Sequence, residues 1–165
     1  MQHSSHMATI YQNQGHYDQA LEIYNSVLDT KIRVCGHDHP DVATSFINIG
    51  AVYAEKGDFE NALVQYQMAL EIQTRVFGSD HLDVAKSYSN IGNVLDDMGK
   101  PEEALVHLQK GLEIKLKLLG SDHPSVAASY SSMGVVLERT GKYEEALEMY
   151  SKSLEIDIRI TARGT

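Results

Sequence analysis

The sequence repeats itself with a period of 42 residues, which Gly36, Gly78 and Gly120 mark. The segments that begin at these glycines read GHDHPDVATSFINIG, GSDHLDVAKSYSNIG and GSDHPSVAASYSSMG. A second series keeps the same step: Gly15, Gly57, Gly99 and Gly141. A fixed period of this size indicates one supersecondary unit stacked on copies of itself. Such arrays usually offer an extended surface for another molecule, so the period bears on function as well as on fold.

Each copy predicts a pair of antiparallel α-helices. Within residues 38–79, apolar residues and glycine recur at steps of three and four along two runs. The runs are Val42, Ala43, Phe46, Ile49, Gly50, Tyr53 and then Ala62, Leu63, Tyr66, Ala69, Leu70, Phe77. Pro40 suits a helix start, whereas Gly57 and Gly78 suit helix ends. No sustained two-residue alternation predicts a strand, so we expect an almost entirely helical chain.

Glycine also recurs inside the first predicted helix of each copy, at Gly50, Gly92 and Gly134. A glycine in a helix interior costs about 1 kcal/mol relative to alanine. We therefore expect a neighbouring helix to approach these positions too closely for a side chain.

Composition and charge exclude several classes of partner. The 165 residues are 42% hydrophobic, which is enough for a core, and they carry a net charge of −9. Nucleic acids and anionic membrane surfaces attract clusters of Lys and Arg, so neither is expected as a partner. No apolar run reaches the roughly 18 residues of a membrane span. The single cysteine, Cys35, excludes an internal disulfide, and we expect a cytoplasmic location.

The repeat resembles a known family. The residues Gly50, Tyr53, Gly57, Phe59, Ala62, Tyr66 and Ala69 fall on the spacing of the tetratricopeptide repeat. The family's usual unit has about 34 residues. The longer unit with its G-x-D-H-P-x-V-A junction is similar to the repeats of kinesin light chain. This resemblance implies an all-α fold, a right-handed superhelical α-solenoid of stacked antiparallel helix pairs.

The repeat frame also divides the chain. Residues 1–6 look like an expression-tag remnant, and residues 7–165 form the array. The array is expected to contain a truncated unit and three full units, at residues 7–36, 37–78, 79–120 and 121–162. We expect the chain to be a fragment of a larger protein, with apolar ends that favour a homo-oligomer stacked end to end.

The resemblance implies that the first helices line a concave groove that meets a protein or peptide partner. Asn48 and Asn90 hold equivalent positions there, and Ser132 follows in the last copy. An asparagine amide has two donors and an acceptor, so it can pair with the backbone of an extended peptide. The alternative is that these residues are solvated on an exposed helix face. The expected partner-binding residues are Asn48, Lys86, Ser89, Asn90, Asn93, Ser131, Ser132 and Arg139.

The chemistry of the partner follows from the charges in this predicted groove. Members of the family that bind chaperone C-termini use a clamp of Lys, Asn, Asn, Lys and Arg, and here Lys86 and Asn90 recover only part of it. The acidic side chains outnumber Lys86 and Arg139, and they are Glu55, Asp96, Asp97 and Glu138. A basic or mixed segment with apolar anchors is therefore expected in preference to an acidic one.

Metal and catalytic sites are not expected. His39, His81 and His123 each follow an aspartate, but a whole repeat separates them, whereas metal ligands stand about 2 Å from one ion. We expect each Asp-His pair to organise its loop and cap the following helix. The chain has no nucleophile elbow and no phosphate-binding glycine loop, so the sequence predicts neither an enzyme nor a cofactor.

Three functions remain open at this point. The first is a protein–protein interaction scaffold that holds a peptide or a helical segment in its groove. The second is a self-assembly element or rigid spacer, in which the groove stays empty. The third is a regulatory repeat arm of a multidomain signalling protein.

Overall fold

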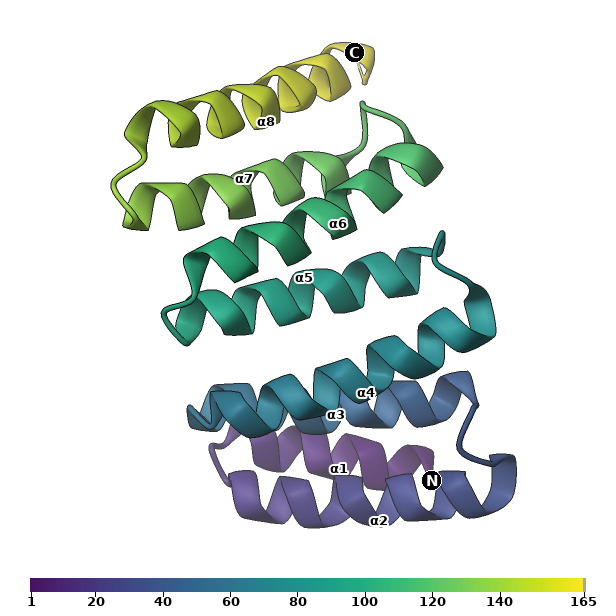
Figure 1. The fold of residues 1–165 in the computed structure, drawn as a ribbon. Helices are drawn as coiled ribbons and strands as arrows, with labels where there is room; N and C mark the ends of the chain where they lie inside the picture. The colour runs from purple at the N-terminus through teal and green to yellow at the C-terminus, as the bar shows by residue number, and fades with distance from the viewer. Residues whose placement is uncertain (165) are drawn as a thin grey trace. The chain divides into compact units, whose positions relative to one another are not determined.

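A computed structural model describes residues 1–164, and the chain divides into two compact units, Met1–Gly78 and Ser79–Thr165. The described residues contain eight α-helices and no strand, which confirms the predicted all-α class (Figure 1). The helices of unit 1 are α1 (Gln2–Asn13), α2 (Tyr17–Cys35), α3 (Pro40–Lys56) and α4 (Phe59–Phe77). Those of unit 2 are α5 (Leu82–Asp97), α6 (Pro101–Leu119), α7 (Pro124–Arg139) and α8 (Tyr143–Arg163).

Each unit consists of two stacked helix pairs. The paired helices are α1 with α2 and α3 with α4 in unit 1, and α5 with α6 and α7 with α8 in unit 2. Contacts between α2 and α3, and between α6 and α7, join the two pairs of a unit. The predicted repeat of antiparallel pairs is thus confirmed. Among residues 1–164, no helix combines the length and the apolar character needed to cross a membrane.

The glycines inside the first helices mark close crossings within the pairs, as predicted. A Cβ atom on Gly50 would stand 2.8 Å from the Tyr66 ring, and one on Gly134 would stand 2.7 Å from the Tyr150 ring. At Gly92 the neighbour is the Cγ atom of Leu108, also at 2.8 Å. The large side chain of the second helix occupies the space that the glycine leaves free.

The Asp-His pairs belong to the architecture of the loops. The Nδ1 atoms of His39, His81 and His123 each accept a hydrogen bond from the backbone N–H two residues later, at 3.0 to 3.1 Å. Each histidine is the N-cap of its helix, α3, α5 or α7. The aspartate before each histidine forms an ion pair with a basic residue near the C-terminal end of the helix that follows, α4, α6 or α8. The pairs are Asp38 with Arg75, Asp80 with Lys117, and Asp122 with Arg159. The predicted loop and capping role is confirmed.

Candidate functional site

The first helices of each unit lie next to one another at their C-terminal ends. In unit 1, the side-chain amide of Gln12 in α1 donates to a carboxylate oxygen of Glu55 in α3 at 2.8 Å. In unit 2, the Arg139 guanidinium of α7 donates to the Asp96 carboxylate of α5. These contacts connect residues 43 positions apart. We call the exposed sides of α1 and α3, and of α5 and α7, the first-helix surfaces of the two units.

The first-helix surface of unit 2 contains a hollow of about 220 Å³. Its lining residues are Asn93, Asp96 and Asp97 from α5, and Ser132, Val135, Val136 and Arg139 from α7. Three of the predicted partner-binding residues, Asn93, Ser132 and Arg139, therefore meet in one place. The hollow offers amide, hydroxyl and carboxylate groups around a small apolar floor.

The side-chain amides of Asn48 and Asn90 are available to a partner. Both residues are half-buried, Asn48 in α3 of unit 1 and Asn90 in α5 of unit 2. Neither amide forms a hydrogen bond with any other residue in the range 1–164. Ser132, at the equivalent position of α7, turns its hydroxyl back onto the carbonyl oxygen of Ala128 at 3.1 Å.

Ser89 and Ser131 face the second helix of their own pair. The Ser131 hydroxyl lies 2.8 Å from the hydroxyl of Ser153 in α8. The Ser89 hydroxyl donates to the Ala85 carbonyl and would lie 3.2 Å from a Cβ atom on Gly111 of α6. A step of one residue turns a helix by about 100°, which separates these serines from the neighbouring Asn90 and Ser132. The hollow therefore does not include them.

Internal contacts engage most of the charged side chains that the sequence placed in the groove. Asp96 holds Arg139, and Gln12 donates to Glu55. The Tyr150 hydroxyl donates to Glu138 at 2.8 Å, and this bond to a carboxylate raises the pKa of Tyr150. Among the described residues, the exposed Asp97 is left without an ion pair or a hydrogen bond. The hollow thus offers a partner fewer free polar groups than its residue types alone indicate.

Lys86 lies in a different hollow, of about 280 Å³, toward the opposite end of α5. It shares this space with Lys115 of α6 and with His123, the N-cap of α7. The Lys115 ammonium donates to the hydroxyl of the buried Ser129 at 3.0 Å. Burial, and secondarily the charge of Lys86, lowers the pKa of Lys115. The structure does not bring Lys86 together with Asn93, Ser132 and Arg139.

Replacing Lys115 by glutamine, the residue that stands one repeat earlier at position 73, is expected to raise the stability of unit 2 at neutral pH. Because the folded pKa of Lys115 is below that of the unfolded chain, the folded state holds this proton less tightly. Lys115 therefore destabilises the folded state fully at pH values below its folded pKa. This destabilisation disappears as the pH rises toward the pKa of Lys115 in the unfolded chain. Thermal unfolding should show a gain in Tm of about 1 to 3 °C at pH 7.

The same comparison at pH 10 provides the control. Here the Tm gain of Lys115→Gln over the wild-type chain should shrink, because more of Lys115 has lost its proton. A Tm below that of the wild-type chain at pH 7 would mean that the bond from Lys115 to Ser129 outweighs the cost of burial.

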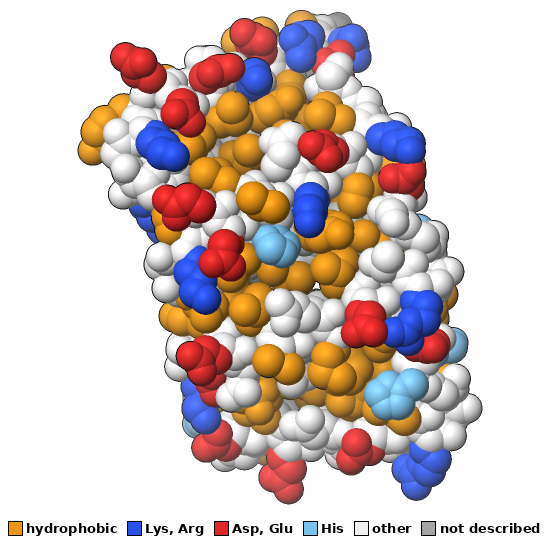
Figure 2. Space-filling model, in the orientation of Figure 1, with side chains coloured by type: hydrophobic (Ala, Val, Ile, Leu, Met, Phe, Trp, Pro, Cys, Tyr) orange, Lys and Arg blue, Asp and Glu red, His pale blue; other side chains and the backbone are white. Residues whose placement is uncertain are grey.

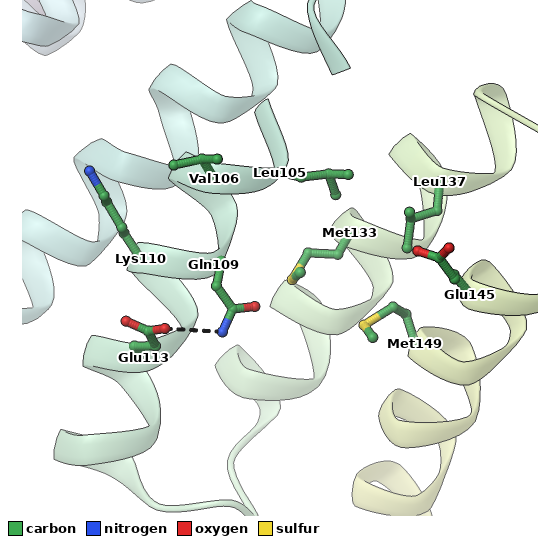
Figure 3. Close-up of a pocket in the computed structure, with 9 residues that line it drawn as sticks. All are labelled: Leu105, Val106, Gln109, Lys110, Glu113, Met133, Leu137, Glu145 and Met149. Atoms are coloured by element: carbon green, nitrogen blue, oxygen red, sulfur yellow. Dashed lines mark hydrogen bonds between the residues drawn. The ribbon is translucent and has the colours of Figure 1, made fainter. Parts of the chain in front are cut away.

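A third hollow, which is apolar, was missed by the sequence analysis. It has a volume of about 530 Å³ and lies between α6 and α8, with α7 at its floor (Figure 3). Its apolar lining residues are Leu105, Val106, Met133, Leu137 and Met149. We call it the α6/α8 groove. The signal in the sequence was a change of residue type, since Leu137 and Met149 stand where the repeat two copies earlier has Tyr53 and Gln65.

A family model described as tetratricopeptide repeat matches residues 1–73, 46–117 and 98–159, which together span most of the chain. A comparison with curated proteins gave no match.

Solved structures with the same fold include that of BtubC (BKLC) from P. vanneervenii, at a TM-score of 0.86 and 24% sequence identity. A Podosopora anserina putative kinesin light chain with nearly identical TPR-like repeats has a TM-score of 0.82 and 23% identity. The structure of MamA gives 0.68 and 21%. Each match covers 96% of this chain, which corresponds to 63%, 75% and 79% of the respective neighbours. At these identities the similarity establishes the fold, a tetratricopeptide solenoid of stacked helix pairs.

Proposed function

Because this chain belongs to the tetratricopeptide repeat family, whose members are generally protein–protein interaction scaffolds, we propose that the first-helix surface of each unit holds an extended peptide segment of a protein partner. The observation that carries the proposal is a half-buried asparagine amide on each surface, Asn48 in unit 1 and Asn90 in unit 2, and neither amide forms a hydrogen bond within residues 1–164. The fold is typically that of a non-enzymatic scaffold, which agrees with this function.

In this proposal, each asparagine amide contacts the backbone of the peptide segment that is bound to its own unit. An amide can donate to a peptide carbonyl and accept from a peptide N–H at the same time, whatever the side chains of that peptide. Since the side-chain amides of Asn48 and Asn90 make no competing hydrogen bond with another residue of 1–164, binding need not break one. The hollow beside Asn93 and Ser132 then receives a side chain, and Asp97 favours a basic one.

The double substitution Asn48→Ala and Asn90→Ala is expected to weaken the binding of such a peptide at least tenfold. Each lost hydrogen bond is worth about 0.5 to 1.5 kcal/mol, and 1.4 kcal/mol corresponds to a tenfold change in Kd. The probe is a fluorescein-labelled 12-residue peptide selected on the wild-type chain from a random display library. Fluorescence anisotropy measures its Kd, and circular dichroism confirms that the helices persist.

Gln67→Ala is the matched control, because Gln67 carries an exposed amide on the second helix α4, outside both first-helix surfaces. This variant should bind the peptide with unchanged affinity. If the double variant binds as tightly as the wild-type chain, the asparagine clamp is wrong and the two residues are solvated surface groups.

A second candidate function is self-association, which the apolar side of α8 favours. Leu154 is 60% exposed, whereas Leu112, one repeat earlier in α6, is 2% exposed. Helix α8 thus exposes a leucine at a position of the repeat that is buried in α6. Light scattering distinguishes the two functions, because a mass that rises with concentration equally in the wild-type chain and the asparagine variant supports self-association.

A further inference from the structure

The α6/α8 groove has an apolar floor and a polar rim. Met133 and Leu137 at the floor are 7% and 4% exposed, while Val106 on the α6 wall is 53% exposed. In Figure 3, Leu105, Met133 and Met149 point toward a common space between the three helices. Hydrophobic side chains also gather over the area between α6 and α8 in the space-filling view (Figure 2). Flexible methionine side chains adapt their shape to an apolar partner.

The lining of this groove is particular to unit 2. At the equivalent positions of unit 1, Tyr53 replaces Leu137, Gln65 replaces Met149 and Asn61 replaces Glu145. A tyrosine ring is larger than a leucine side chain, and an amide is polar where the thioether is apolar. The repeat fold therefore does not require an apolar groove at this place. The apolar character of the groove comes from the particular residues of α6, α7 and α8.

The rim of the groove is acidic. Glu113 on α6 accepts a hydrogen bond from Gln109 at 3.3 Å, and Glu145 on α8 has no hydrogen bond or ion pair within residues 1–164. Lys110, a cationic residue of the rim, points away from the methionines, and its ammonium stands 5.6 Å from the centre of the Tyr88 ring (Figure 3). A partner with basic residues would meet two carboxylates, whereas a second copy of this chain, with a net charge of −9, complements the acidic rim less well.

We propose that the α6/α8 groove binds an amphipathic, basic helix of a protein partner. The volume of about 530 Å³ lies in the range of sites that take several apolar groups. Apolar side chains one helical turn apart enter between Met133 and Met149, as in other helix-in-groove complexes. Lysine or arginine side chains flanking them face Glu113 and Glu145. This site lies between second helices and is independent of the peptide proposed for the first-helix surfaces.

The substitution Val106→Glu tests the apolar contact, and Val64→Glu is its matched control. The two valines hold equivalent positions on α6 and α4, and they are 53% and 49% exposed, so neither change disturbs a core. The probe is a fluorescein-labelled 18-residue helix of leucine and lysine, with leucines at steps of three and four residues. We expect the wild-type chain to bind it with a Kd on the order of 10 µM. Val106→Glu should weaken binding at least tenfold, and Val64→Glu less than twofold.

Glu145→Gln tests the charge, with Glu103→Gln at the equivalent position of α6 as its control. The first substitution should weaken binding about threefold to fivefold and reduce its dependence on salt, and the second should change neither. The Asn48→Ala and Asn90→Ala variant should bind this helix normally, which separates the groove from the proposed peptide site. The proposal is overturned if Val64→Glu and Val106→Glu lose equal affinity, or if a scrambled peptide of the same composition binds equally well.

Discussion

Replacing Ile49 by alanine is expected to lower the free energy of unfolding of unit 1 by about 3 to 4 kcal/mol. Ile49 lies in α3, is 1% exposed, and belongs to a buried hydrophobic cluster of that unit. Alanine removes three carbon atoms from the core, so both lost burial and the remaining cavity contribute to the loss. Hydrogen exchange at the α3 amides measures the effect, because repeat arrays unfold locally as well as globally.

Met133 offers the comparison, since it occupies the same position of the repeat in α7. Its side chain also forms the floor of the open α6/α8 groove. Water can enter the space that Met133→Ala leaves, so we expect a loss of about 2 kcal/mol, at the lower end of the range for such substitutions. If Met133→Ala costs as much as Ile49→Ala, the floor of the groove behaves as closed core instead.

Gly111→Val is expected to destabilise unit 2 by about 3 kcal/mol. A Cβ atom on Gly111 of α6 would stand 2.9 Å from the backbone oxygen of Ala85 in α5. Replacing a glycine in a helix interior by alanine normally gains about 1 kcal/mol, and replacing it by the β-branched valine gains less. Here that gain is outweighed, because a backbone oxygen cannot rotate away as a side chain can. Thermal and urea unfolding followed by circular dichroism should both show the loss.

Gly164→Ala is the control for this substitution. Gly164 has an ordinary negative φ of −79°, and a Cβ atom there would lie 3.6 Å from its nearest neighbour, the Thr161 carbonyl oxygen. Its replacement should change stability by no more than about 0.5 kcal/mol. A Gly111→Val variant as stable as the wild-type chain would show that α5 and α6 can separate without cost.

Local features of the sequence were sufficient to predict the helix pairs. The spacing of apolar residues, the prolines at helix starts and the glycines at helix ends all act within a few residues. The crossings at Gly50, Gly92 and Gly134 were also predictable, because a glycine that recurs inside a helix needs a neighbour close by. The capping role of His39 and its equivalents follows the same logic, since the hydrogen bond joins positions two residues apart.

The candidate site was only partly predictable. The unengaged amides of Asn48 and Asn90 lie on the first helices, where the repeat frame placed them. Ser89 and Ser131, however, face the second helices, because one residue along a helix changes the direction of a side chain by about 100°. Arg139 was expected to be available to a partner, but Asp96 binds it from the preceding repeat.

The sequence by itself determined the family, the helices and the repeat frame, because these depend on spacing along the chain and on the residues at helix ends. The tertiary structure decided which polar groups remain available, since Asp96 reaches Arg139 across 43 residues only when α5 and α7 lie next to each other. It also created the α6/α8 groove, whose walls come from two different helix pairs. Contacts of this kind depend on how the helices pack, and the pattern within one helix does not contain that information.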